Sequence, residues 1–130
     1  ISGAGSCEMP SEVEVDSGLV LATVTGPWSR TAAEQLQREI VDAMERGSCS
    51  GLLLDLRRAE IDVNTMGMFE ITASHAEVFP LSFKHAVLVS ESGLAREDAR
   101  FCENVAMNRG IKMRIFYENA EAARRWLRQD

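Results

Sequence analysis

The sequence is poor in the residues from which disulfide frameworks and zinc sites are built. It contains only three cysteines, Cys7, Cys49 and Cys102, and no two of them form a CxxC pair. An odd, widely spaced set fits poorly with a disulfide framework and offers no cluster of zinc ligands. We therefore expect reduced thiols, no metal site and a cytoplasmic location.

Long apolar runs and an excess of positive charge are also missing. No segment approaches the roughly 20 apolar residues that cross a bilayer, and no basic segment precedes the apolar core of a signal peptide. The formal net charge is −6, whereas a protein that binds nucleic acid usually presents a basic face. The sequence therefore argues against a membrane-spanning protein and against a nucleic-acid partner.

The short motifs of catalysis and nucleotide binding are missing as well, since no GxSxG, GxGxxG, Walker or HExxH pattern occurs. A Cys–His nucleophile pair would need Cys49 or Cys102 beside His75 or His85, as an exposed and activated thiolate. Cys102 falls on the predicted core face of its helix, where a cysteine is usually an inert hydrophobe. We expect a non-enzymatic protein with no catalytic residue and no cofactor; a cysteine- or carboxylate-dependent enzyme is the weaker alternative.

What the sequence does have is the composition of one globular domain. The chain has 130 residues, of which 45% are hydrophobic, and can therefore bury a single core. Residues 1–10 begin with a small, Gly/Ser-rich stretch, and we expect them to be a disordered terminus or a remnant of an expression vector. Residues 11–130 are expected to fold as the one domain.

The predicted elements are arranged around Gly51–Gly67. Its first part, Leu52–Leu56, is apolar at every position except Asp55. This composition predicts a strand buried on both faces, as in parallel strands covered by helices. A polar loop follows, and the apolar pattern then resumes as a predicted helix over about 64–77.

Hydrophobic periodicity and turn signals predict the remaining elements. Acids and valines alternate over 12–16, and Ser17-Gly18 connects this strand to a second one, which predicts an antiparallel hairpin. Helices alternate with strands after the hairpin. Strands are predicted at 12–16, 19–25, 52–56, 85–90 and 112–117, and helices at 31–46, 64–77, 94–108 and from 120 onwards.

Three local signals set the expected ends of the early elements. Gly26-Pro27 is expected to end the second strand, because proline cannot donate to a ladder. Thr31 and Glu34 have the spacing of a capping box, which predicts the start of the first helix. Gly47 is expected to be the left-handed residue that ends this helix.

The order of elements predicts the class of fold. An opening hairpin followed by alternating helices and strands, β-β-α-β-α-β-α-β-α, indicates an α/β domain. We expect a mixed, mostly parallel sheet of about five strands with helices packed on it.

Three segments carry a resemblance to a known family: Leu52–Arg57, Phe101–Gly110, and Arg114–Phe116 with the following Glu121–Leu127. In these segments the chain resembles the STAS domain superfamily, in particular its SpoIIAA-like branch, whose members include anti-sigma factor antagonists. The resemblance spans about residues 13–128. It implies the SpoIIAA-like fold, and it implies a regulatory protein as partner; this fold is also compared with lipid-binding CRAL-TRIO domains.

The resemblance also implies a candidate phosphoacceptor. In phosphorylation-switched members a strand ending in Asp-Leu leads to Asp-Ser-Ser/Thr-Gly at a helix start, and the first serine is phosphorylated. Anchored on Gly67, this motif places Asn64 at the aspartate and Thr65 at the phosphoacceptor. Thr65, Asn64 and Asp55 are therefore the candidate anion or phosphate site. The alternatives are that Asn64 or Thr65 only caps the helix, and that Asp55 pairs with Arg57 or Arg58.

The helix predicted after the central strand is more apolar than one covered face requires. A helix that is apolar nearly all round is buried or presents a patch to something apolar. We predict that it lies over a pocket for a small apolar or lipid-like ligand. Peripheral contact with a membrane, contact with a second copy in a homodimer, or a plain core position are the alternatives. The predicted ligand-binding residues are Met68, Phe69, Ile71 and Phe79, with Trp28 as an aromatic wall.

Overall fold

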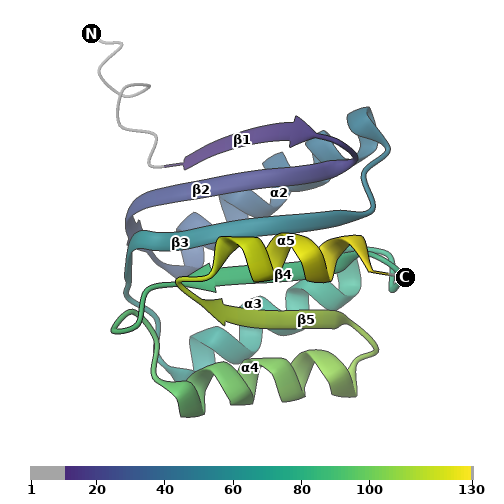
Figure 1. The fold of residues 1–130 in the computed structure, drawn as a ribbon. Coiled ribbons are helices and arrows are strands. Elements are labelled where there is room, and N and C mark those ends of the chain that lie inside the picture. Colours follow the sequence, from purple (N-terminus) through teal and green to yellow (C-terminus); the bar gives the residue numbers. More distant parts are fainter. Residues whose placement is uncertain (1–10, 130) are drawn as a thin grey trace, which may run out of the picture.

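The computed structural model describes residues 11–129, apart from the side chains of Thr65 and Ala76. The expectation for residues 1–10 lies outside the described residues. The elements follow in the predicted order (Figure 1). They are β1 (Ser11–Asp16), β2 (Leu19–Trp28), α2 (Arg30–Gly47), β3 (Gly51–Ile61), α3 (Thr65–Val78), β4 (Lys84–Val89), α4 (Arg96–Asn108), β5 (Lys112–Tyr117) and α5 (Ala120–Arg128).

The strands form one five-stranded sheet in the order β1-β2-β3-β4-β5. The pair β1–β2 is antiparallel and the other three pairs are parallel. The predicted α/β class and the mixed, mostly parallel sheet are therefore confirmed. All carboxyl ends of β2 to β5 lie at one edge of the sheet, which we call the carboxyl edge, and their amino ends lie at the opposite, amino edge (Figure 1).

Helices cover both faces of the sheet, as Figure 1 shows: α2 and α3 lie behind it, α4 runs alongside β5, and α5 lies in front, along the strands. Leu52, Leu54 and Leu56 of β3 belong to the core on the α2 side, and Leu53 packs with Ala123 and Leu127 of α5. The central strand is thus buried on both faces, as its leucine run predicted.

The strands β2 and β3 are both longer than predicted. After Asp55 the strand β3 loses its partner β4 but stays paired with β2 as far as Ile61. A bulge of one residue on β3 shifts the register, because Thr23 pairs with Asp55 whereas Thr25 pairs with Arg58. The result is a two-stranded extension beyond the carboxyl edge, in which polar side chains remain exposed.

The prediction that Gly26-Pro27 ends β2 is therefore wrong. Pro27 pairs in register with Glu60, and the strand continues to Trp28. Within the described part of the chain, β1 accompanies β2 only as far as Val24. Past this point no described residue pairs with that side of β2, so among residues 11–129 the missing N–H of Pro27 costs no ladder hydrogen bond.

Both predicted ends of α2 are displaced. Ser29, not Thr31, is the N-cap, and its Oγ accepts from the Ala32 amide at 3.2 Å. The helix starts earlier because a competent cap lies directly after β2, and Glu34 pairs with Arg30 instead (3.4 Å). At the other end Ser48, with φ 50°, takes the left-handed position expected for Gly47.

Candidate functional site

A small apolar cavity lies beneath α3, near the carboxyl edge of the sheet. Its volume is about 70 Å³, and none of its fifteen lining side chains is ionised at neutral pH. We call it the α3 cavity. It is lined by Leu54, Leu56, Val87, Val89, Met113 and Ile115 from the sheet, Met68, Ile71, Thr72 and His75 from α3, Cys102 from α4, and Trp28, Ile61, Val63 and Leu94 around it.

The start of α3 is built around a close contact. Asn64 is the N-cap, and its Oδ1 accepts from the Gly67 amide at 2.8 Å. Val63, just before the cap, and Met68 both line the α3 cavity, in the positions of a hydrophobic staple. A Cβ on Gly67 would lie only 2.5 Å from Val63 Cγ1, so this position needs glycine.

Thr72 of α3 and Cys102 of α4 are polar residues that contact each other in the lining of the α3 cavity. The Thr72 hydroxyl donates to the Met68 carbonyl at 2.9 Å. Burial raises the pKa of the Cys102 thiol, and a hydrogen bond with Thr72 only partly opposes this effect. Cys102 is 8% exposed, so it is not the exposed, activated thiolate that a cysteine nucleophile requires.

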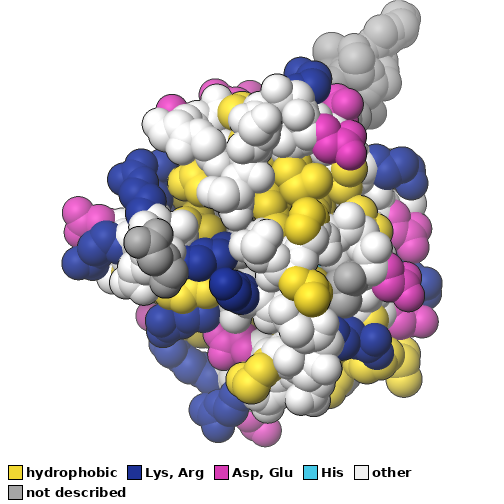
Figure 2. Space-filling view, turned by 90° about the vertical axis from the view of Figure 1, so that its right-hand side faces the viewer, with side chains coloured by type: hydrophobic (Ala, Val, Ile, Leu, Met, Phe, Trp, Pro, Cys, Tyr) yellow, Lys and Arg dark blue, Asp and Glu magenta, His cyan; other side chains and the backbone are white. Residues whose placement is uncertain are grey.

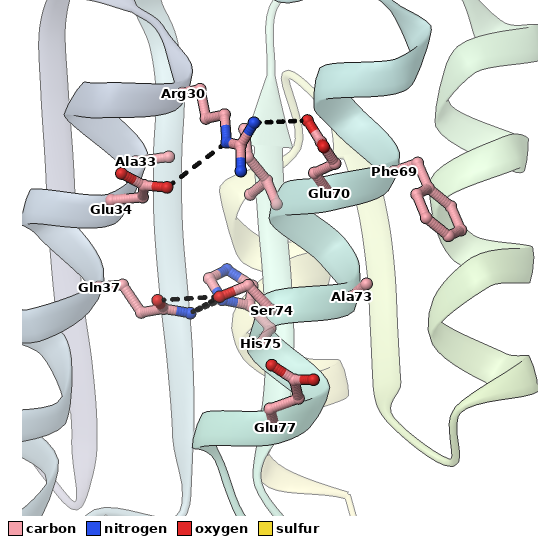
Figure 3. Close-up of a pocket in the computed structure, with 11 residues that line it drawn as sticks. Arg30, Ala33, Glu34, Gln37, Phe69, Glu70, Ala73, Ser74, His75 and Glu77 are labelled. Atoms are coloured by element: carbon pink, nitrogen blue, oxygen red, sulfur yellow. Dashed lines mark hydrogen bonds and ion pairs between the residues drawn. The ribbon is translucent and has the colours of Figure 1, made fainter.

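A polar groove of about 340 Å³ runs between α2 and α3 (Figure 3), and Ile71 and His75 line both this groove and the α3 cavity. Arg30 of α2 bonds Glu70 of α3 at 2.8 Å. One turn further along α3, Ser74 Oγ (3.2 Å) and His75 Nδ1 (2.8 Å) bond the side chain of Gln37 on α2. These contacts hold α3 against α2, and we call them the α2–α3 latch.

His75 and His85 stack at 5.4 Å between ring centroids and are both buried. Phe79 packs edge-on against both rings, and Phe83 against His85. Burial lowers the pKa of His75 to about 4, and burial together with the neighbouring His75 lowers that of His85 to about 3. Both histidines are therefore neutral at pH 7, and neither ring nitrogen of His85 has a hydrogen-bond partner within residues 11–129.

Asp55 lies away from the α3 cavity. Its position in β3 alternates with Leu54 and Leu56, which face α2, so Asp55 points to the α5 side of the sheet. Arg57 binds the carboxylate with Nη2 at 2.9 Å and Nε at 3.1 Å. Partial burial acts to raise the pKa of Asp55, but the hydrogen bonds and charge of Arg57 outweigh it and lower the pKa. The structure therefore separates Asp55 from Asn64.

The residues predicted to bind a ligand divide between three places. Met68, Ile71 and Trp28 line the α3 cavity. Phe69 lines the polar groove, and the Arg109 guanidinium lies 5.4 Å from its ring centre. Phe79 belongs to the aromatic cluster around His85.

Sequence reasoning missed several lining residues, among them Thr72, Val63 and Leu94. The spacing of Val63, Asn64 and Met68 is a staple signal that could have identified the first turn. Nothing local identifies Leu94 or Met113, which come from separate segments. Within residues 11–129 no group of three or more His, Cys, Asp or Glu side chains could hold a metal ion.

The described part of the chain contains no helix with the length and apolar character to cross a membrane. No protein-family model matches the sequence, and no curated protein sequence matches it. Solved structures do match.

The chain superposes on an anti-sigma factor antagonist from Mycobacterium paratuberculosis with a TM-score of 0.61 and 18% identity, over 92% of this chain and 93% of that one. It superposes on the anti-sigma factor antagonist SpoIIAA, in its unphosphorylated form, with a TM-score of 0.60 and 15% identity, over 92% and 99%. An uncharacterised protein of the DUF3478 family from Shewanella loihica PV-4, described as having a SpoIIAA-like fold, matches with a TM-score of 0.54 and 13% identity, over 90% and 91%. The resemblance seen in the sequence is confirmed at the level of the fold: this chain has the SpoIIAA-like fold.

Proposed function

We propose that this protein is a non-enzymatic binding domain that takes up a small apolar or lipid-like ligand beneath α3. The observation that carries the proposal is the α3 cavity, whose lining contains no ionised side chain and lies at the carboxyl edge of a parallel sheet. Ligands of open α/β sheets bind outside the carboxyl ends of the strands. Apolar lining with few polar groups is typical of small-molecule sites.

The volume of the cavity limits what it holds while α3 is in this position. At about 70 Å³ it is smaller than an engineered cavity of about 150 Å³ that binds benzene, and far below the roughly 300–1,000 Å³ of ordinary ligand pockets. An acyl chain therefore enters only when α3 moves outward. The helix would act as a lid, and its position in the structure is the closed one.

The α2–α3 latch supports this role for α3. The Arg30–Glu70 pair is partly exposed, with side-chain exposures of 55% and 38%, and exposed ion pairs contribute only about 0–1 kcal/mol. The latch also includes the Gln37 bonds to Ser74 and His75. These polar bonds at the rim add little to the cost of opening, which is set mainly by the packing of Met68 and His75 beneath the helix.

The experiment measures melting temperatures with medium-chain alcohols and fatty acids, and mass spectra of the native protein for co-purified lipid. Met68→Ala enlarges the α3 cavity and destabilises the protein by about 2–5 kcal/mol, and we expect an apolar ligand to raise its melting temperature more than that of the wild type. Leu53→Ala creates a comparable cavity on the α5 face and is the matched control, with a ligand response like the wild type. If no alcohol, fatty acid or co-purified lipid binds the wild type or Met68→Ala, the proposal fails.

A phosphorylation-switched regulator that acts on a protein partner is the second candidate. It is favoured by the shared fold with anti-sigma factor antagonists and by Thr65 being the first residue of α3, next to the Asn64 cap. The free amides and positive dipole end of a helix N-terminus stabilise a phosphate. Recovery of a partner by tagged wild type but not by Thr65→Asp would support this function; recovery of the same proteins by both would count against it.

A further inference from the structure

The amino edge of the sheet carries a cluster of exposed apolar side chains. Within residues 11–129 five large hydrophobic side chains are exposed, and three of them, Val78, Leu81 and Met107, belong to the segments that end α3 and α4 at this edge. Leu81 is 57% exposed and Met107 68%. Figure 2 looks onto this edge and shows hydrophobic side chains with both basic and acidic side chains among and around them.

Leu81 and Met107 are neighbours although they are far apart in the sequence. Leu81 packs over Gly110, where a Cβ would lie 3.5 Å from its Cδ2. The Gly110 amide in turn donates to the Met107 carbonyl at 3.0 Å. Both apolar side chains therefore project from the same corner of the molecule. We call Val78, Leu81 and Met107 the amino-edge patch.

Positive charge lies on the β5 and α5 side of the patch, whereas Glu103 lines the groove beside Met107 and the exposed Glu77 precedes Val78. Lys112 lines a groove together with Met107, and it also lines a hollow of about 360 Å³ together with Ser82, the neighbour of Leu81. Two further cations, Lys84 and Arg128, line this hollow, and no acidic side chain does. Lys84 is held in place because its Nζ donates to the carbonyls of Trp126 and Gln129 at the end of α5.

The charge of the whole chain is unevenly distributed. Residues 11–83 contain five Lys and Arg against twelve Asp and Glu, whereas residues 84–129 contain nine against six. Most acids of the second part lie towards the carboxyl edge, either in the connection from β4 to α4 and the first turn of α4 or between β5 and the first turn of α5. The amino edge of this half is therefore positive although the protein as a whole is negative.

We propose that the amino-edge patch docks the protein on an anionic lipid bilayer. Leu81 and Met107 enter the apolar layer, and Lys112 and Arg128 meet the phosphates of the lipid head groups, while Lys84, bonded at the end of α5, adds positive charge behind them. Each cation near an anionic surface strengthens binding by roughly fivefold, and burial of each apolar side chain adds to it. A second copy is the less suitable occupant, because a symmetric contact through this patch would oppose like charges.

The inference stands independently of the proposed ligand. It uses the amino edge, whereas Trp28, Ile61, Val63 and Leu94 place the α3 cavity near the carboxyl edge. If the protein docks on bilayers but binds no ligand, the ligand proposal alone fails. If it binds a ligand but never docks, the docking proposal alone fails.

The test is co-sedimentation of the protein with vesicles of phosphatidylcholine, with and without phosphatidylglycerol. We expect the wild type to bind the anionic vesicles about tenfold or more tightly than the neutral ones, and high salt to remove the difference. The double variant Leu81→Ser, Met107→Ser is expected to lose about tenfold in binding, and Lys112→Glu a similar factor.

Matched controls lie at the other edge of the sheet. Met66→Ser removes a methionine that is 63% exposed at the start of α3, and Arg58→Glu reverses an exposed cation on the β2–β3 extension. Both variants should bind like the wild type, and all variants should melt like it. Equal binding to both kinds of vesicle, or equal loss in the control variants, overturns the proposal. So does self-association of the wild type, seen by sedimentation without vesicles, that the Leu81→Ser, Met107→Ser variant abolishes.

Discussion

His85 is the residue with the most unusual surroundings in the described structure. Its ring is 1% exposed, is enclosed by His75, Phe79 and Phe83, and has no hydrogen-bond partner for either nitrogen within the described residues. A buried polar group without a partner costs free energy of folding. Two neutral imidazoles can stack in the core at pH 7, but protonation at acidic pH would place a charge in this buried stack.

The two histidines predict how stability depends on pH. Their folded-state pKa values, about 4 for His75 and about 3 for His85, lie below the unfolded value of about 6.5. The unfolded chain therefore binds protons that the native protein does not, and the free energy of unfolding falls as pH falls from about 7 to about 4. Each histidine contributes a slope of up to about 1.4 kcal/mol per pH unit.

Replacing His85 tests this assignment. His85→Leu should reduce the histidine-dependent slope between pH 7 and pH 5 by about half, and should cost little or no stability at pH 7, because it removes a buried group without partners. Urea unfolding at several pH values measures both effects. A slope identical to that of the wild type would show that His85 is not buried in the neutral form.

Gly67 is the second residue with a sharp prediction. Alanine is the better helix former by about 1 kcal/mol, yet Gly67→Ala should destabilise the protein by about 1–3 kcal/mol, since the new Cβ would meet Val63 Cγ1 at 2.5 Å. Denaturant unfolding would measure the loss. Shortening Val63 in the double variant Gly67→Ala, Val63→Ala should leave a smaller loss than the sum of the single changes, and strict additivity would contradict the contact.

At the scale of the element, α3 is the helix held by polar bonds on its α2 side and by apolar packing beneath. Gln37→Leu removes two of the latch bonds and should speed amide hydrogen exchange across α3 several-fold while leaving the β-strands unchanged. It should also strengthen binding of an apolar ligand, because a larger fraction of the protein is then open.

The control for this variant lies on the same helix. Asp42→Asn breaks the exposed ion pair of Asp42 with Arg46 (3.1 Å) on α2, and should leave exchange in α3 as it is. Faster exchange in both variants would indicate general destabilisation instead of a released lid.

The elements also show how far local sequence patterns determine this fold. The leucines of β3 and the periodicity of β1, α2 and β5 were enough to predict the order of elements, the class of the sheet and the interior position of Leu52–Leu56. The β2–β3 extension was not predicted, since Arg57 to Glu60 is polar and becomes a strand only through pairing with β2. The cap at Ser29 was missed because two cap signals stood close together and the sequence does not rank them.

The candidate site was also predictable only in part, because local sequence patterns do not show how distant segments pack together. The excess of apolar residues on α3 pointed to the helix that covers the cavity, and Met68, Ile71 and Trp28 do line it. Phe69 lies on another side of this helix and Phe79 follows it as the C-cap, because the pattern of α3 is apolar nearly all round and so does not say which side faces the sheet. Contacts between segments distant in the sequence, such as Thr72 with Cys102, leave no local signal.

At the scale of the whole molecule, the SpoIIAA-like fold separates two regions with different surroundings. The carboxyl edge holds the start of α3 and the α3 cavity, and the amino edge holds the exposed apolar patch with its cations. The edge strand β1 exposes Glu12, Glu14 and Asp16, and charges on an edge strand discourage pairing with another copy. A homodimer, if it forms, is therefore expected to use a helical face instead of β1.

The central claim, that α3 covers a cavity for an apolar ligand, is tested most directly by the methyl groups of the methionines. In an NMR titration of methyl-labelled protein with octanol, the signals of Met68 and Met113, which line the α3 cavity, are predicted to shift and saturate. The signals of Met44 on α2 and of the exposed Met107 on α4 should stay in place. Shifts confined to the exposed methionine, or no saturable shift of Met68 and Met113, would contradict the account.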